Sequence, residues 1–521
     1  MTVWRNKRLS AAVAAGAAAL VTVAGATPAQ ATYGTPGAPG LGDRLYPLLG
    51  NGGYDVRDYA LSLRYPAKDP AQTITGTVTI SAVATQALSR FDLDFGGGSV
   101  GAVSVNGHAA RFTRTGDELV ITPRQALRKG KRFTVTVSRF TATPVQANAD
   151  SPVGFVTTPD GTVLAGQPDT SHLLFPSNDH PRDKATYTIS LTVPKGWTAV
   201  ANGRHVRDKT SGNAVTSTYR ESAPMASELV QVVAGDYVVQ KRPAAGGVPI
   251  RDVVPRRFAS TLLPKADAER SQVTWMQGKV GKYPFENYGS LVIDANLGFA
   301  LETQTLSLYD TGLFARPAYV LNPIMTHELA HQWFGDSVAP YEWSNVWQNE
   351  GHATWYELVY ADEKGYLQQY AGAPDLDTYF KGVYASGDRY RSTYGPVAAP
   401  LRSDSIWDVF NPNVYDGGAL VLYALRQQVG AATFQRIERA WVTKYRGKSA
   451  SSAQFVALAS QVAQRDLRGF LNAWLYGTKT PAMPGHPDWT VTPATAPVPA
   501  AVVRSEASTG ARLQRLGAGT H

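Results

Sequence analysis

The sequence of 521 residues contains no cysteine. This absence excludes disulfides and thiolate metal sites, so any metal ligands must come from histidine and carboxylate side chains. Beyond residue 31, no stretch approaches the roughly 20 apolar residues that a membrane-spanning helix needs. Histidine is also scarce, with nine in the whole chain. A pair of histidines at a metal-binding interval is therefore not expected from composition alone.

Long runs of one charge are missing as well. The formal net charge is +9, and Lys and Arg form no cluster longer than a few residues. An excess this small and dispersed does not support nucleic-acid binding. We expect no nucleic-acid partner, and no sequence feature fixes an oligomeric state.

The start of the chain has the three parts of an export signal. The stretch 9–26 is apolar and rich in Ala and Val, and Ala29-Gln30-Ala31 is a small-x-small cleavage site. The basic start is formed by Arg5, Lys7 and Arg8. Because two glycines interrupt the apolar run, and Pro28 and the cleavage site end it, removal is favoured over membrane anchoring. The sequence predicts a signal peptide over 1–31, cleaved after Ala31, and a secreted protein without a membrane span in its mature form.

The chain divides by pattern into two large parts. Residues 32–50 are rich in Gly and Pro, which is typical of a linker or of an extended lead-in to the first domain. Between 51 and 246, apolar and polar residues alternate, which predicts half-buried antiparallel strands and an all-β domain. Clear examples of this alternation are 74–80, 133–137 and 187–193.

The pattern changes to helical spacing over 247–482. The predicted elements are helices at 267–279, 323–334, 351–364, 415–428 and within 431–478, and a strand at 290–294. For the helix 323–334, we expect Asn322 as the N-cap, Pro323 at the first position and Gly335 as the terminator. The aromatic residues at helical spacing between 434 and 441 favour a core rather than a binding surface. Residues 483–521 are predicted to form a flexible tail.

One short segment contains the residues that predict a metal site. In His327-Glu328-Leu329-Ala330-His331, the histidines are four apart, so both imidazoles lie on one face of a helix. Zinc needs such convergent nitrogens, and Glu350 can supply a third, oxygen ligand. The fourth position is then open for water, as in catalytic zinc sites. Glu328 points elsewhere on the helix and can reach that water.

The motifs resemble those of the M1 family of zinc aminopeptidases, specifically the short secreted type of actinobacteria that lacks a large C-terminal helical domain. They are Thr326-His327-Glu328-Leu329-Ala330-His331-Gln332-Trp333-Phe334-Gly335, Trp347-Gln348-Asn349-Glu350-Gly351, Phe175-Pro176-Ser177-Asn178-Asp179-His180-Pro181, Lys184-Ala185-Thr186-Tyr187, Tyr283-Pro284-Phe285 and Tyr415-Asp416-Gly417-Gly418-Ala419-Leu420. The resemblance implies a saddle-like antiparallel β-sheet domain followed by a thermolysin-like, mainly helical zinc-peptidase domain.

The resemblance also implies roles for individual residues. The zinc ligands for one Zn²⁺ per chain are His327, His331 and Glu350, with Glu328 as general base. Tyr415 corresponds to the tyrosine that stabilises the oxyanion. Glu302 corresponds to the glutamate that binds the free α-amine of a peptide substrate, and Gln167 to a glutamine that assists it.

Two departures from the family pattern affect these expectations. Gly417 stands where a lysine is usual. Around Glu302 the usual Gly-x-Met-Glu-Asn is replaced, with Phe299, Leu301 and Thr303 at the Gly, Met and Asn positions. A side chain at the Gly position can shift the register of a bound peptide or narrow its first pocket.

Two further acids are candidates for orienting the ligands. Glu357 is seven residues after Glu350, on the same helix face, and can hold a ligand histidine in place. Asp336, just past the zinc helix, is a second candidate. The alternatives to an aminopeptidase are a zinc endopeptidase, an epoxide-hydrolase-like enzyme of the same fold and a non-catalytic peptide-binding module.

Overall fold

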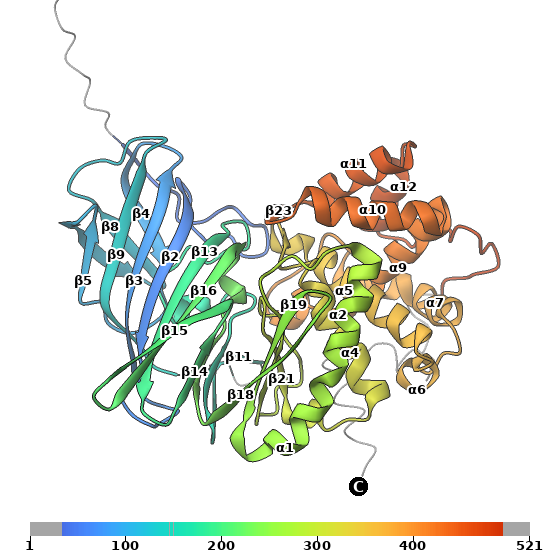
Figure 1. Cartoon of the computed structure of the whole chain (residues 1–521). Coiled ribbons are helices and arrows are strands. Elements are labelled where there is room, and N and C mark those ends of the chain that lie inside the picture. Colours follow the sequence, from blue (N-terminus) through green and yellow to red (C-terminus); the bar gives the residue numbers. More distant parts are fainter. Residues whose placement is uncertain (1–33, 145, 149–150, 493–521) are drawn as a thin grey trace, which may run out of the picture.

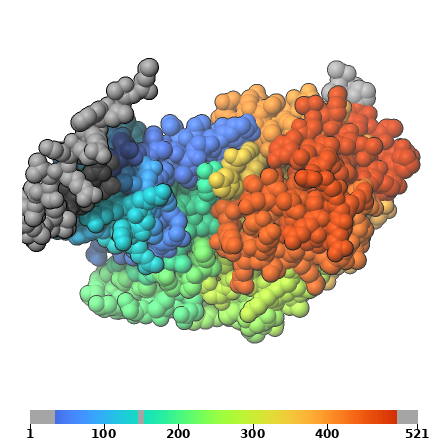
Figure 2. Space-filling model, turned by 90° about the horizontal axis from the view of Figure 1, so that it is seen from above, coloured from blue at the N-terminus to red at the C-terminus, as the bar shows by residue number. Residues whose placement is uncertain are grey.

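The computed structural model describes residues 34–144, 146–148 and 151–492 (Figure 1). The predicted signal peptide and its cleavage site lie outside these residues. The described chain forms two parts, a β domain built from β1–β17 and a helical domain that contains β18–β23 and α1–α12. The space-filling view shows the two in broad contact (Figure 2). This arrangement confirms the predicted fold class.

The β domain consists of three sheets whose alternating side chains enclose one hydrophobic core. The largest has eight strands in the order β15 (Arg204–Ser211), β16 (Ala214–Met225), β13 (Ala185–Pro194), β2 (Tyr54–Arg64), β3 (Ile74–Ala84), β9 (Arg132–Ala142), β5 (Ala102–Val105) and β6 (His108–Ala109). A five-stranded sheet follows the order β10 (Gln146–Asn148), β11 (Ser151–Thr158), β12 (Gly161–Ala165), β17 (Val232–Gly235) and β14 (Thr198–Ala201). The third sheet has the order β1 (Thr35–Pro36), β4 (Leu88–Asp94), β8 (Glu118–Thr122) and β7 (Arg111–Thr115). Each of the three predicted alternating runs lies within a strand.

A four-stranded sheet joins the two parts. It has the order β18 (Tyr237–Ala245), β19 (Val248–Pro255), β20 (Ser290–Ile293) and β21 (Ser307–Asp310), so the domain boundary expected at 246 falls in its first hairpin. Side chains of a strand alternate between its faces. Leu291 and Ile293 accordingly pack into the core of the β domain, whereas Val292 packs into the core of the helical domain.

The helices form the second layer of the helical domain. They are α1 (Ala259–Leu262), α2 (Ala268–Val280), α3 (Thr311–Phe314), α4 (Ala318–His331), α5 (Trp347–Glu363), α6 (Leu367–Ala371), α7 (Leu376–Tyr394), α8 (Ile406–Val409), α9 (Pro412–Val429), α10 (Ala431–Lys444), α11 (Ser452–Ala463) and α12 (Arg468–Tyr476). A short pair of strands, β22 (Val338–Pro340) and β23 (Lys448–Ala450), completes the domain. As predicted, the aromatic residues of α10 are core. Among the described residues, no helix is long and apolar enough to cross a membrane.

The start of α4 corrects one prediction. The helix begins at Ala318, after Pro317, so Asn322 and Pro323 lie inside it rather than at its beginning. A proline often marks the start of a helix, and both Pro317 and Pro323 are candidates. In the structure Pro317 directly precedes the first helical residue. Because Pro323 has no N–H, the carbonyl of Tyr319 loses its usual partner, a local cost that the buried packing of α4 outweighs.

The predicted linker and tail also require correction. Residues 34–50 are packed chain: Leu45 and Leu49 are buried in the helical-domain core, and Asp43 Oδ2 lies 3.1 Å from His180 Nε2. At the other end, Met483 and Trp489 are buried in the same core, so the chain is packed up to 492. The rest of the predicted tail lies outside the described residues. The first segment is rich in Gly and Pro and the second in Pro, Ala and Thr, which suggested mobility, but scattered apolar side chains anchor the described part of both.

Candidate metal centre and active site

Two adjacent helices bring the three predicted ligands together. α4 carries His327 and His331 one turn apart, and α5, which packs against α4, carries Glu350 in its first turn. Glu350 Oε2 lies 3.3 Å from Nε2 of each histidine. The three ligand atoms are within 4.8 Å of one another, and all three side chains are at least 97% buried.

The other nitrogen of each imidazole is already engaged. His327 Nδ1 lies 2.7 Å from Glu357 Oε2, and His331 Nδ1 lies 3.1 Å from the carbonyl oxygen of Phe334. Since both partners are acceptors, each ring can donate through Nδ1–H, which leaves Nε2 as the nitrogen that would bind a metal. Two imidazole nitrogens and one carboxylate oxygen are the donor set of a catalytic zinc site. The site therefore fits one Zn²⁺.

The charges at the cluster reinforce this fit. Burial opposes ionisation of Glu350, yet His331 and His327 lower its pKa to about 2. Burial likewise opposes the charged form of His327, but hydrogen bonds to Glu350 and Glu357 raise its pKa to about 9. The site thus holds an ionised carboxylate whose negative charge favours positive charge on the two imidazoles. A divalent cation that replaces the imidazole protons satisfies the same attraction.

Glu328 lies beside the cluster without a partner. Its side chain is buried, and Oε2 has no hydrogen-bond partner among the described residues. Burial raises the pKa of Glu328 to about 8; His327 and His331 oppose this rise, and Glu302 adds to it. A free carboxylate with a raised pKa next to a metal site can accept and return a proton near neutral pH.

Two hydrogen bonds, one to the side chain and one to the backbone, hold Glu302 next to His331. Gln167 Nε2 donates to Glu302 Oε1 at 2.7 Å, and Glu302 Oε1 is 3.9 Å from His331 Nδ1. Gln332, the residue after the second ligand, donates to the backbone carbonyl of Glu302 at 3.1 Å. Its own Oε1 accepts from Thr305 N at 2.9 Å. These contacts join the segment between β20 and β21 to α4, and they place the Glu302 carboxylate beside His331.

The unusual residues around Glu302 serve the packing of this turn. Leu301 is buried and pairs with Leu308 through two backbone hydrogen bonds of 2.9 and 2.7 Å. The hydroxyl of Thr303 donates to the carbonyl of Leu306, which closes the turn. Phe299 packs against the core of the β domain. All three side chains pack or hydrogen-bond within the protein. Their departure from the usual pattern therefore does not displace the Glu302 carboxylate.

Tyr415 reaches the cluster because α9 and α5 cross closely. A Cβ on Gly351 would lie 2.8 Å from the carbonyl carbon of Gly418, so only glycine permits this approach. The ring of Tyr415 stacks on His327, with centroids 6.0 Å apart and planes at 18°. Burial, followed by the charges of Glu350 and Glu302, raises the pKa of Tyr415 well above 10. The phenol therefore stays protonated and can donate a hydrogen bond.

Gly417 has its own steric reason. A Cβ at this position would lie 2.1 Å from Asn413 Oδ1, and Asn413 Nδ2 donates to the carbonyl of Gly395 at 2.7 Å. The amide of Asn413 thus occupies the space that the usual lysine would need to leave the helix. Glycine in place of the usual lysine at 417 is thus matched by Asn413, which lies one turn earlier in α9.

The two acids expected to orient the ligands behave differently. Glu357 contacts His327 and accepts a hydrogen bond of 2.6 Å from Tyr370 in α6. Asp336 is buried, but neither carboxylate oxygen has a hydrogen-bond partner in the described part of the chain. The carbonyl of Phe334 contacts His331 in its place. Sequence reasoning missed Tyr370, which lies on a separate short helix with no motif around it.

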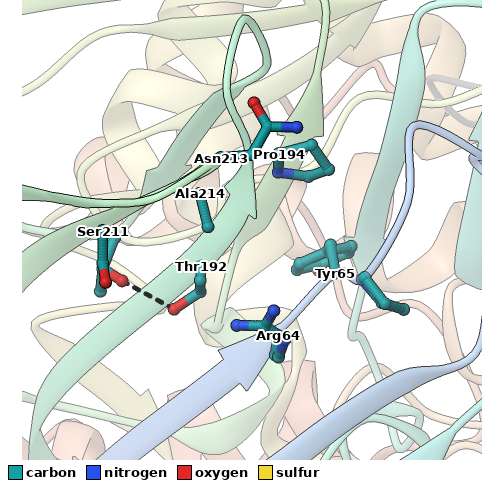
Figure 3. Close-up of a pocket in the computed structure, with 9 residues that line it drawn as sticks. Arg64, Tyr65, Thr192, Pro194, Ser211, Asn213 and Ala214 are labelled. Atoms are coloured by element: carbon teal, nitrogen blue, oxygen red, sulfur yellow. Dashed lines mark hydrogen bonds between the residues drawn. The ribbon is translucent and has the colours of Figure 1, made fainter.

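A cavity of about 430 Å³ lies apart from this cluster (Figure 3). It lies on the eight-stranded sheet, and Thr192 on β13 and Thr216 on β16 form a 2.8 Å hydroxyl–hydroxyl hydrogen bond within it. Its other lining residues are Arg64, Tyr65, Pro66, Pro194, Ser211, Asn213 and Ala214. None of them belongs to the metal cluster.

Both parts of the chain match known families. The Peptidase M1 N-terminal domain model matches residues 56–229, and the Peptidase family M1 domain model matches residues 268–474. The glutamyl aminopeptidase of Homo sapiens is 25% identical over 319 residues, which are 59% of this chain and 33% of that protein. The match thus spans about a third of the length of this curated relative.

Solved structures resemble almost the whole described chain. The M1 zinc metallopeptidase of Deinococcus radiodurans has a TM-score of 0.75 and 26% sequence identity, covering 85% of this chain and 99% of that one. A mutant of that protein bound to a Tyr-Ser-Ala substrate gives a TM-score of 0.73 at 28% identity, covering 86% and 100%. The two-domain arrangement is therefore shared with zinc metallopeptidases.

Proposed function

Because this chain belongs to peptidase family M1, we propose that it is a zinc aminopeptidase that removes N-terminal residues from peptides. The observation that carries the proposal is the pairing of Gln167 and Glu302 beside the metal cluster. A buried carboxylate at this place attracts a cationic α-amine and fixes it at a short distance from the scissile bond. A peptide with a blocked amine, or one bound through its middle, offers no charge there.

In the proposed reaction, His327, His331 and Glu350 hold Zn²⁺. When bound, the metal supplies Lewis acidity that polarises the scissile carbonyl and acidifies a water molecule. Glu328 accepts the proton of the attacking water at its carboxylate and passes it to the nitrogen of the leaving peptide. Glu328 is buried beside the ligand histidines and its Oε2 makes no hydrogen bond to the described residues, which supports this role.

Tyr415 acts on the other side of the reacting carbonyl. Its protonated hydroxyl donates a hydrogen bond to the oxyanion of the tetrahedral intermediate. The ring is already fixed by stacking on His327. Because the donor is oriented before the charge develops, the hydrogen bond strengthens in the transition state.

We also propose that the enzyme acts outside the cell, on peptides with a free N-terminus. The basic start, apolar run and small-x-small site over residues 1–31 support export. The absence of cysteine removes any dependence on the redox state of the compartment.

The decisive experiment compares free and N-acylated aminoacyl fluorogenic substrates, before and after removal of the metal by a chelator. We expect hydrolysis of the free compounds only, loss of activity in the metal-free protein, and recovery on adding Zn²⁺. Preferential cleavage of blocked or internal peptides would instead indicate an endopeptidase. Turnover of epoxides without turnover of peptides would place the chain in the small-molecule branch.

A further inference from the structure

The β domain contacts the turn that follows the metal-binding helix through one lysine. Lys184, immediately before β13, donates from Nζ to the carbonyl oxygens of Asp336 and Ser337, the latter at 3.0 Å. Lys184 belongs to a motif of the β domain that the proposed reaction does not use. Its ammonium is partly buried at this contact.

The same turn supplies the acceptor for the second metal ligand. His331 Nδ1 donates to the carbonyl of Phe334 at 3.1 Å. The turn then folds back on the helix end, where Asp336 N donates to the carbonyl of His331 at 3.0 Å. Moving the carbonyls that Lys184 holds therefore moves the backbone that sets the orientation of the His331 ring.

A positive charge suits this position. Both carbonyls that Lys184 binds lie beyond the end of α4 at His331, and each carbonyl oxygen is an acceptor with partial negative charge. Hydrogen bonds from an ammonium group are also stronger than neutral ones. Burial lowers the pKa of Lys184 to about 8, and the nearby acids Asp336 and Glu228 oppose that fall. A neutral side chain at 184 would lose both the charge and the two hydrogen bonds.

We propose that Lys184 is a positioning residue for the metal site: the β domain uses it to fix the turn after α4, and thereby the ring of His331. The inference rests on the proposed zinc site. It assigns the β domain a part in metal binding as well as in holding the substrate amine. It also gives the position of the turn a cause outside the metal-binding helix.

Arg182 provides a matched control on the same segment. Its Nε donates to the carbonyl of Tyr341 and its Nη1 to that of Leu41, each at 3.0 Å. The guanidinium also stacks over the Tyr341 ring at 4.0 Å. Arg182 thus joins the same two domains, but in the helical domain it binds Tyr341, which lies beyond the turn. Loss of Arg182 loosens the interface and leaves the carbonyls of Asp336 and Ser337 bound to Lys184.

The experiment compares the full-length wild type with K184M and R182M. The zinc dissociation constant is measured by competition with a chromophoric chelator, and the Co²⁺-substituted proteins are examined by visible absorption. We expect K184M to bind zinc more weakly than the wild type, by less than the roughly 10–100-fold loss typical of removing a direct partner of a ligand histidine, with an altered Co²⁺ spectrum. R182M should lower the melting temperature yet keep the wild-type affinity and spectrum.

Two results would overturn the inference: wild-type zinc affinity and spectrum in K184M, or an equal loss of affinity in R182M. If K184M shows no cooperative thermal transition, K184Q takes its place under the same criteria, since its shorter neutral side chain also cannot hold both carbonyls. A wild-type protein that binds no zinc would contradict the proposed function itself, which separates that failure from failure of the role of Lys184.

Discussion

Glu357 Oε2 lies 2.7 Å from Nδ1 of His327, so the acid on α5 fixes the orientation of the imidazole on α4. The second oxygen of Glu357 accepts from Tyr370 at 2.6 Å, which holds the carboxylate itself. The order of these contacts makes Glu357 the direct support of the ligand and Tyr370 an indirect one. Their removal should therefore have graded effects.

We expect E357A to weaken zinc binding by about 10–100-fold, because His327 loses the acceptor that sets its tautomer. Tyr370→Phe removes one hydroxyl and leaves the contact between Glu357 and His327, so its loss should be smaller. Chelator competition at fixed pH measures both. Equal affinity in E357A and the wild type would show that the tautomer is set by other means.

Removing the carboxylate of Glu328 separates chemistry from metal binding. E328Q keeps the shape of the side chain but cannot accept the proton of water. We expect kcat to fall by about 10²–10⁴-fold, the usual contribution of a positioned base, with the metal content unchanged. Steady-state kinetics and metal analysis on the same sample test this. Undiminished turnover in zinc-loaded E328Q would exclude Glu328 as the base.

Tyr415 should affect the transition state more than the ground state. Y415F retains the ring that stacks on His327 and loses the hydroxyl. We expect kcat to fall by about 10²–10³-fold with KM changed little, as for removal of one oxyanion donor. Parallel determination of kcat and KM tests the split. A rise in KM alone would assign the hydroxyl to substrate binding.

The local features of this site could be read from sequence because they depend on helix geometry. The interval between His327 and His331, and that between Glu350 and Glu357, place each pair on one helix face whatever the rest of the fold does. The alternating runs of the β domain likewise specify strands that bury one face. These predictions need no knowledge of distant segments.

The features that sequence reasoning missed depend on tertiary packing. Nothing local relates Lys184 to Ser337, or Tyr370 to Glu357, since each pair is joined by the docking of separate elements. The helix start was misplaced because Pro317 and Pro323 carry the same signal, and only packing selects between them. The segment 34–50 resembles a linker in composition, yet a few buried leucines anchor it.

Glu302 should control the preference for a free amine. E302Q removes the negative charge while keeping the shape, so a cationic amine loses a charge-assisted hydrogen bond of about 1.5–3 kcal/mol. We expect kcat/KM for free aminoacyl substrates to fall by roughly 10–150-fold. Gln167→Ala, which removes only the amide that holds Glu302, should cost less. An unchanged ratio of free to acylated substrates in E302Q would locate the amine elsewhere.

The last prediction concerns the stability of the β domain. His172 Nδ1 lies 2.8 Å from Asp179 Oδ2, and the His172 side chain is 12% exposed. Burial favours the neutral imidazole, but the hydrogen bond and charge of Asp179 raise the pKa of His172 to about 9. The folded state therefore binds a proton that the unfolded chain, with a pKa near 6.5, releases earlier.

A raised pKa stabilises the folded state fully below the unfolded value and loses that effect as the pH passes the folded value. The difference in unfolding free energy between the wild type and H172N should thus be largest below about pH 6.5. It should shrink by up to about 3 kcal/mol as the pH rises to about 9. Urea titrations of both proteins from pH 6 to 9.5 measure it. A difference that stays constant over this range would mean that His172 is neutral in the folded protein.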